Sequence, residues 1–312
     1  MPGTKINSAL KEQVINTLLY FDIFSYPLNA SEVFTFLHVN GCSQSDVKYC
    51  LDDLAEHQML FRSGDLYSLH AGDKNIGRRI KGNVESEKWL KVAVKKARLI
   101  ASFPYVRAVM ASGSLSKGYM DEKSDLDFFI ITAPNKLWIA RTLLVLYKRI
   151  FLLNSHKHFC VNYFVDTRHL EIEEKNLFTA TELSTLIPLG NNEYYDSLIA
   201  SNRWVHEFFP NFRSRESHDA DKGDSHFMRR FSEFLLNPFS ELLDKVFMRM
   251  TLKRWNKLYG EKYDKNDFDI AFKTRRHVSK NHPNHYQKKV LDLYQCKLVE
   301  HKNKFGKVEA YE

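Results

Sequence analysis

Two aspartates that lie two positions apart in the chain are the residues best suited to chemistry. Asp125 and Asp127 lead into one apolar run, and Gly113 and Ser114 follow the apolar run before it. Side chains at positions i and i+2 of a strand point to the same face, so the two carboxylates can hold divalent cations together. Magnesium binds carboxylates together with phosphate oxygens, and a glycine lets backbone N–H groups approach a phosphate closely. The pattern predicts a site for phosphate groups and Mg²⁺ or Mn²⁺.

The segment VRAVMASGSLSKGYMDEKSDLDFFIIT resembles the signature of the polymerase-beta-like nucleotidyltransferase superfamily. That signature is a Gly-Ser after one strand and an Asp-x-Asp at the start of the next. The resemblance implies that Asp125 and Asp127 bind the catalytic metal ions. It also implies that Gly113 and Ser114 grip a nucleoside triphosphate. Lys117, in the loop between, would pair with a phosphate oxygen or be an ordinary solvated lysine.

The same resemblance implies a third carboxylate on the next strand, where two residues compete for the place. Asn162 and Asp166 share one face of the predicted strand 159–166, and they lie ~13 Å apart along an extended chain. The ions of a two-metal site are only ~4 Å apart, so both residues cannot serve the same pair. Asp166 would complete a catalytic set of three acids, although it is also typical of a turn. Asn162 in this place would leave the third acid missing.

The residues before this segment predict a separate small domain over 1–72. Three helical patterns are followed by a hairpin pattern around Gly64, and together they resemble a winged helix. The domain has four Lys/Arg and eight Asp/Glu, and the third helix has four acids with Lys48 as its only Lys/Arg. A helix that enters a DNA groove needs the opposite balance, so the charges argue against DNA binding by this domain.

The nucleotidyltransferase core is predicted over 73–190, with the resemblance itself covering about 84–190. Its expected elements, in order, are a basic helix 84–103, strands 106–112 and 125–132, helix 136–153, strand 159–166 and helix 179–187. The cations of the first helix (Lys88, Lys91, Lys95 and Arg98) form either a solvated flank or a ridge facing a polyanion. Residues 191–312 are predicted to be a helical C-terminal domain with a polar linker at 212–225 and a basic tail.

Composition narrows the classes of protein to consider. The net charge of +8 gathers in the middle and at the C-terminus, which suits phosphate-rich ligands. The four cysteines are scattered without a Cys-x-x-Cys pair, which argues against a zinc site or a disulfide framework and predicts a cytoplasmic location. No apolar run approaches the ~20 residues that span a bilayer, so no membrane partner is expected.

The sequence therefore predicts an α+β fold in which a small mixed sheet with helices follows a winged-helix-like domain and precedes a helical one. The predicted activity is Mg-dependent transfer of a nucleoside monophosphate from a nucleoside triphosphate to an acceptor that the sequence does not identify. One alternative is a non-catalytic nucleotide-binding or regulatory protein that keeps the fold. A further alternative is a winged-helix DNA-binding regulator.

Overall fold

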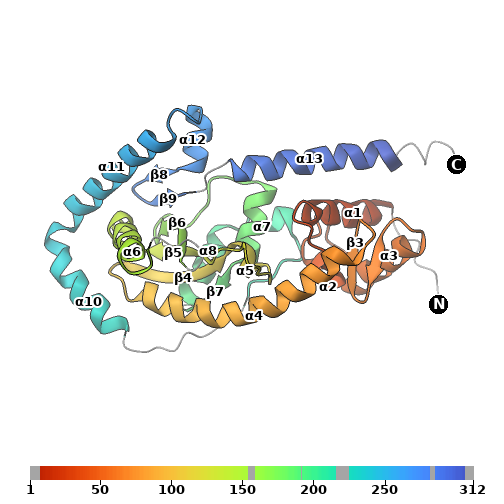
Figure 1. The fold of residues 1–312 in the computed structure, drawn as a ribbon, viewed down its shortest axis with the longest axis horizontal. Coiled ribbons are helices and arrows are strands. Elements are labelled where there is room, and N and C mark those ends of the chain that lie inside the picture. Colours follow the sequence, from red (N-terminus) through yellow and green to blue (C-terminus); the bar gives the residue numbers. More distant parts are fainter. Residues whose placement is uncertain (1–7, 154–158, 191, 216–224, 282–284, 306–312) are drawn as a thin grey trace.

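The computed structural model describes residues 8–153, 159–190, 192–215, 225–281 and 285–305. It is a mixed α+β structure with a small antiparallel sheet near the N-terminus and a six-stranded mixed sheet in the middle (Figure 1). None of the helices in these ranges is long and apolar enough to cross a bilayer. All four cysteines are unpaired.

The N-terminal part contains the three helices and the hairpin that the sequence predicts, and a short strand that was not predicted pairs with the hairpin to give a three-stranded sheet. Its elements are α1 (Ser8–Asp22), β1 (Leu28–Asn29), α2 (Ala30–Thr35), α3 (Gln44–Glu56), β2 (Phe61–Ser63) and β3 (Leu66–Ser68), with strand order β1-β3-β2. Capping boxes at Asn29 and Ser43 start the second and third helices, because each side chain binds the backbone N–H three residues on. Asp52 of α3 binds both Lys48 (3.3 Å) and Arg62 (2.9 Å), so two of the few cations here are already paired.

A long helix leads from this part to the central sheet. α4 (Asp73–Ala101) starts eleven residues earlier than the predicted basic helix. Its extra turns are held by tertiary contacts that the sequence does not display, such as the buried Arg79 bound to Glu32 at 2.7 Å. The predicted basic stripe on α4 is exposed to solvent, and Lys88 is paired with Glu85 at 2.6 Å. Exposure is expected both for a solvated flank and for a ridge that faces a polyanion, so both interpretations of the stripe stay open.

The central sheet has the strand order β7-β4-β5-β6-β9-β8. Its main strands are β4 (Val106–Ser112), β5 (Asp127–Thr132) and β6 (Cys160–Asp166). β4 and β5 are antiparallel, whereas β5 and β6 are parallel. A parallel pair needs a crossover, and α6 (Leu137–Phe151) supplies it with Trp138 fully buried.

The C-terminal region is largely helical but is not all-helical as predicted. The remaining elements are α5 (Gly113–Ser116), α7 (Leu177–Thr185), β7 (Ile187–Pro188), α8 (Asn192–Ser201), α9 (Val205–Phe208), α10 (Ser225–Leu236), the 3₁₀ helix η1 (Asn237–Phe239), α11 (Ser240–Tyr259), α12 (Lys265–Ala271), β8 (Thr274–Arg275), β9 (Val278–Lys280) and α13 (Tyr286–Phe305). β9 pairs with β6, so the last strands complete the central sheet across the expected boundary at residue 190. Such short polar strands show no strand pattern in the sequence, because they are stabilised by pairing with a neighbouring strand. Much of the predicted linker, 216–224, and the end of the tail, 306–312, lie outside the described residues.

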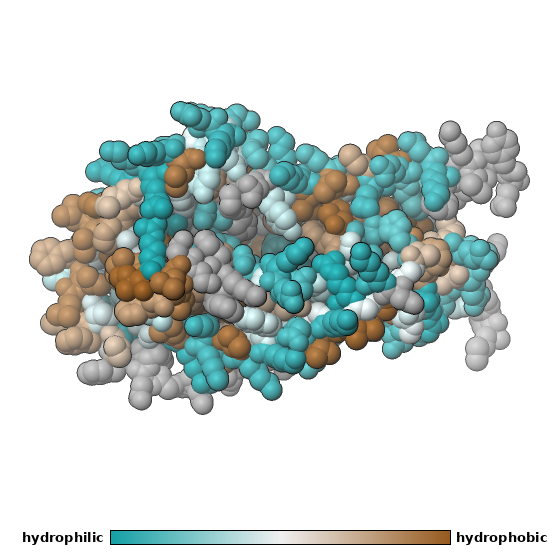
Figure 2. All heavy atoms as spheres, in the orientation of Figure 1, coloured by the Kyte–Doolittle hydropathy of each residue, from teal (hydrophilic) through white to brown (hydrophobic). Residues whose placement is uncertain are grey.

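α10 and α11 form one end of the molecule, and apolar residues cover much of that end (Figure 2). At the opposite end, α13 lies beside α1. The rings of Tyr20 and Tyr294 meet edge to face at 5.4 Å, and Lys297 binds Asp22 at 2.6 Å.

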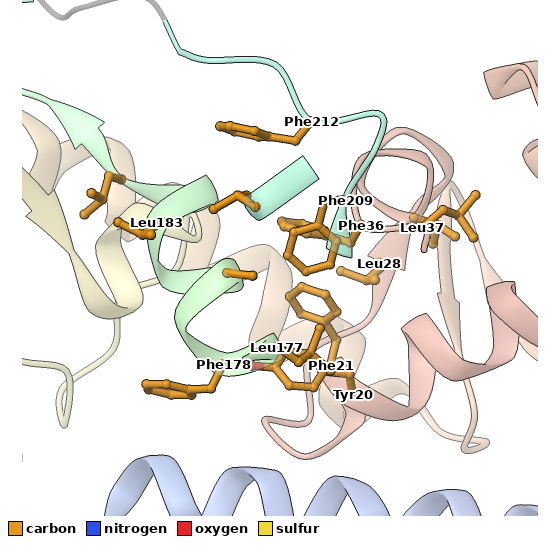
Figure 3. Close-up of a cluster of buried hydrophobic side chains, with 14 of the residues drawn as sticks. Tyr20, Phe21, Leu28, Phe36, Leu37, Leu177, Phe178, Leu183, Phe209 and Phe212 are labelled. Atoms are coloured by element: carbon orange, nitrogen blue, oxygen red, sulfur yellow. The ribbon is translucent and has the colours of Figure 1, made fainter. Parts of the chain in front are cut away.

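The N-terminal part is packed directly on the core. Phe21 and Phe36 contribute to one buried cluster with Leu177 and Phe178 of α7 and with Phe209 (Figure 3). Burying aromatic and aliphatic side chains on this scale is the dominant stabilising term in folding. The N-terminal part is therefore fixed against the face of the core that carries the candidate site.

Candidate functional site

The turn after β4 brings the glycine and one of the aspartates face to face. Ser112 is paired with Asp127 in the antiparallel register, and Gly113 follows with a φ of +64°. A Cβ atom at Gly113 would lie 2.4 Å from Oδ2 of Asp127, which is far inside van der Waals contact. Only glycine fits this position, both for its backbone conformation and for the close approach. Gly113, Ser114 and Asp127 therefore lie close together and line one cavity.

The two aspartates do not occupy equivalent positions. β5 begins at Asp127, so Asp125 lies in the segment before the strand and is exposed, whereas Asp127 is half-buried. The pKa of Asp127 is raised to about 7, chiefly by burial and also by the charges of Asp125 and Glu182, against the opposing effects of Cys160 and Lys117. The strand geometry expected for the pair does not hold, and Asp125 is not among the residues that line the cavity.

Asn162 takes the place of the expected third acid. Its Nδ2 donates a 2.7 Å hydrogen bond to Oδ1 of Asp127, and its Oδ1 accepts one from the Cys160 thiol at 3.0 Å. The pairing of β5 with β6 shifts register between Val161 and Tyr163, so Asn162 is the extra residue of an irregularity in the ladder. Such irregularities often re-aim a side chain next to a functional site.

Asp166 is not part of this site, and its predicted catalytic role is corrected here. It pairs with Thr132 at the far end of β5, five residues or ~17 Å along the strand from Asp127. The carboxylate is fully buried and accepts hydrogen bonds from the Arg168 backbone at 2.9 Å and the His169 ring at 2.8 Å. Asp166 therefore shapes the turn after β6, which was the other role open to it.

Lys117 is neither solvated nor free. Its Nζ donates to Glu182 Oε1 at 2.7 Å and to the Gly113 carbonyl at 3.2 Å. The Tyr26 hydroxyl donates to the Lys117 carbonyl, which fixes the end of the turn. Sequence reasoning missed Glu182, because what distinguishes it is a property of the structure: it is the only residue of α7 that is not buried. A single acid in a buried helix is a candidate for a functional role.

These residues line a cavity of about 330 Å³. Its lining combines eight residues without an aromatic ring (Ser112, Gly113, Ser114, Lys117, Asp127, Asn162, Glu182 and Asn281) with six aromatic residues (Phe21, Phe24, Tyr26, Tyr119, Phe178 and Tyr286). The volume lies at the lower end of the range for small-molecule sites, which usually combine an apolar wall with a few convergent polar groups. Three separate parts of the chain thus meet around one pocket.

The acidic residues of this site suit a metal ion that is coordinated partly by the protein and partly by the phosphates of a bound molecule. Within the described ranges, no group of three or more His, Cys, Asp or Glu side chains could hold a metal ion by itself. Asp127 supplies one carboxylate, which Asn162 orients, whereas the exposed Asp125 precedes β5 and is not among the residues that line the cavity. Mg²⁺ is typically bound by one or two carboxylates together with substrate phosphates rather than by a cage of protein groups.

Comparison with known proteins identifies no relative. No family model matches the chain, and neither a curated protein nor a solved structure matches it significantly. The proposals below therefore depend on the residues of the cavity and on their geometry.

Proposed function

We propose that the cavity binds the triphosphate of a nucleotide with Mg²⁺ or Mn²⁺, and that the chain is a nucleotide-binding protein with a nucleotidyltransferase-like core. The observation that carries this proposal is the 2.7 Å bond from Asn162 to Asp127, at the place expected for a third acid. A neutral amide adds no negative charge toward a second metal ion and cannot act as a general base. Binding without rapid transfer is the function that this geometry favours.

The polar and the aromatic residues of the cavity support a nucleotide as the ligand. Gly113, Lys117 and Asp127 offer a close backbone approach, a cation and a metal ligand for phosphates. The lining also includes the rings of Phe21 and Tyr286 among others, on which a base can stack. A bound metal ion would neutralise charge on the phosphates.

A second candidate function, nucleotidyl transfer, is favoured by the position of Glu182. Its carboxylate lines the same cavity and is held 2.7 Å from Lys117. A triphosphate that pairs with Lys117 would release Glu182 to accept the proton of an acceptor hydroxyl. Transfer of a nucleoside monophosphate would then use a base from α7 instead of an acid from β6.

Calorimetry and a labelling assay on the full chain test both proposals. Each of the four ribonucleoside triphosphates is titrated with Mg²⁺ into the wild type, into Asp127→Ala and into the control Asp196→Ala, an exposed acid on α8. Binding should be lost only in Asp127→Ala, and equal affinity in all three would contradict nucleotide binding at this site. Transfer from an α-labelled triphosphate that disappears in Glu182→Gln would favour the second candidate over the first.

A further inference from the structure

An exposed apolar stripe runs along α10 and α11 and through the 3₁₀ turn between them. Its members recur every three or four residues, and each is more than a third exposed: Met228, Phe231, Phe234, Leu235, Phe239, Leu242, Val246 and Met250. The three phenylalanines alone, each more than half exposed, present roughly 300 Å² of apolar surface. That area already approaches the largest apolar patch of an ordinary monomer.

The inner face of the same helices is apolar as well. Leu243, Phe247 and Leu252 pack against the cluster that covers the central sheet. A helix that is apolar on both faces is normally covered on both. α6, which packs against α11, also carries the exposed apolar residues Ile150 and Phe151, at 58% and 68% exposure. The outer face of α10 and α11 is therefore exposed, although its apolar composition is typical of a surface that is covered.

The charge around the stripe is positive. Five exposed cations of α10 and α11 have no ion-pair partner within the described part of the chain: Arg230, Arg249, Lys253, Arg254 and Lys257. The acids of these helices are already engaged. Glu233 binds Arg107 at 2.7 Å, Asp244 is buried against the backbone of α6, and Glu241 binds Lys245 at 3.1 Å.

The shape of this end is convex. α10 and α11 meet at an angle around η1, with the central sheet behind them, so the turn with Phe239 projects at the end of the molecule (Figure 1). The cations flank the stripe: Arg230 follows Met228 on α10, Arg249 lies next to Met250 in the middle of α11, and Lys253 lies one turn further on. An apolar stripe flanked by cations matches the profile of a bilayer surface, where the acyl region lies beneath the headgroups.

We propose that this end of the molecule docks on an anionic membrane surface, with the α10–α11 turn in the acyl boundary and the cations among the headgroups. The proposal is independent of the nucleotide site. A second copy of the chain fits less well, because two convex tips touch over a small area and bring unpaired cations together. The expectation of no membrane partner rested on the lack of a spanning segment, which surface docking does not need.

Sedimentation of the full chain with vesicles tests the proposal. The wild type should sediment with vesicles of three parts phosphatidylcholine to one part phosphatidylserine, and much less with phosphatidylcholine alone. Phe234→Asp and Phe239→Asp should each weaken binding about tenfold, whereas Phe61→Asp, which alters an exposed ring in the N-terminal part, should not. Lys253→Glu should weaken binding to the anionic vesicles about fivefold, and Lys91→Glu on α4 should have little effect.

A conservative variant keeps the test decisive if the aspartate variants fail to fold. Phe239→Trp retains an aromatic ring, and its added indole fluorescence should shift to shorter wavelength with the anionic vesicles only. Wild-type protein that stays in the supernatant, or equal binding by wild type and Phe239→Asp, would overturn the proposal. A dimer in analytical ultracentrifugation that Phe239→Asp converts to a monomer would assign this surface to a second copy instead.

Discussion

Replacing Asp127 by asparagine should stabilise the protein without metal or nucleotide, although it should abolish metal-dependent binding. The folded chain holds this carboxylate half-buried, beside the charges of Asp125 and Glu182, and its pKa rises from 3.8 to about 7. The asparagine oxygen can still accept the hydrogen bond from Asn162. The substitution therefore removes an unfavourable charge and keeps the favourable contact.

The size and the pH dependence of the effect follow from proton linkage. Because Asp127 binds its proton more tightly in the folded chain, the wild type should lose stability as pH rises from about 4 to about 7 and change little above that. A pKa rise from 3.8 to about 7 corresponds to at most about 4 kcal/mol. A half-buried carboxylate retains part of its solvation, so we expect Asp127→Asn to be more stable by ~2 kcal/mol at pH 8.

Urea unfolding in the presence of a chelator, at pH 4 and at pH 8, measures this difference. The gain should be small at pH 4, where the carboxyl is neutral in the folded chain and still partly protonated in the unfolded chain, and should reach its full size at pH 8. Asp196→Asn, at an exposed acid on α8, is the matched control and should change stability little at either pH. A variant that is less stable than the wild type at pH 8, or a gain of equal size at both pH values, would refute the reasoning.

Three further outcomes follow from the geometry. Gly113→Ala should destabilise the protein by ~3 kcal/mol and abolish nucleotide binding, whereas Gly64→Ala, with a similar positive φ and open space around it, should cost only ~1 kcal/mol in thermal unfolding. Asp166→Asn should leave nucleotide affinity in calorimetry unchanged and should lower the melting temperature, because a buried hydrogen-bond acceptor of the turn is lost. A large loss of affinity would show that Asp166 belongs to the site. Lys48→Ala and Arg62→Ala should not alter the affinity of the full chain for duplex DNA or its dependence on salt, and a reduced salt slope in a filter-binding assay would show that the N-terminal part contacts phosphates.

Local spacing was enough to predict the centre of the site. Gly113 and Asp127 stand at facing ends of two strands with a short connection, so any antiparallel pairing brings them together. The choice between Asn162 and Asp166 depended instead on the register of β6 against β5. The predicted crossover helix already implied a parallel pair, in which the start of each strand lies beside the start of the other. That argument favours Asn162, whereas the irregularity that aims its side chain has no signal in the sequence.

The rest of the cavity could not be predicted from local pattern. Phe21 and Tyr286 lie at opposite ends of the chain, and each is explained equally well as part of a core. Their meeting depends on how α1 and α13 pack, which is a property of the whole fold. Glu182 became a candidate only once the burial of the remaining residues of α7 was known.

The contribution of residues far apart in the sequence to one pocket has a consequence for how the protein is made. Tyr286 is synthesised after the other residues that line the pocket, so the pocket cannot close before the chain has been made beyond this residue. Contacts between residues so far apart in sequence also form slowly, because the ends of a long loop must first meet. The nascent chain should therefore pass through a stage in which α1 has been synthesised but its aromatic residues next to the pocket have not yet packed with α13. A nucleotide that binds only the closed pocket would then report on completed folding.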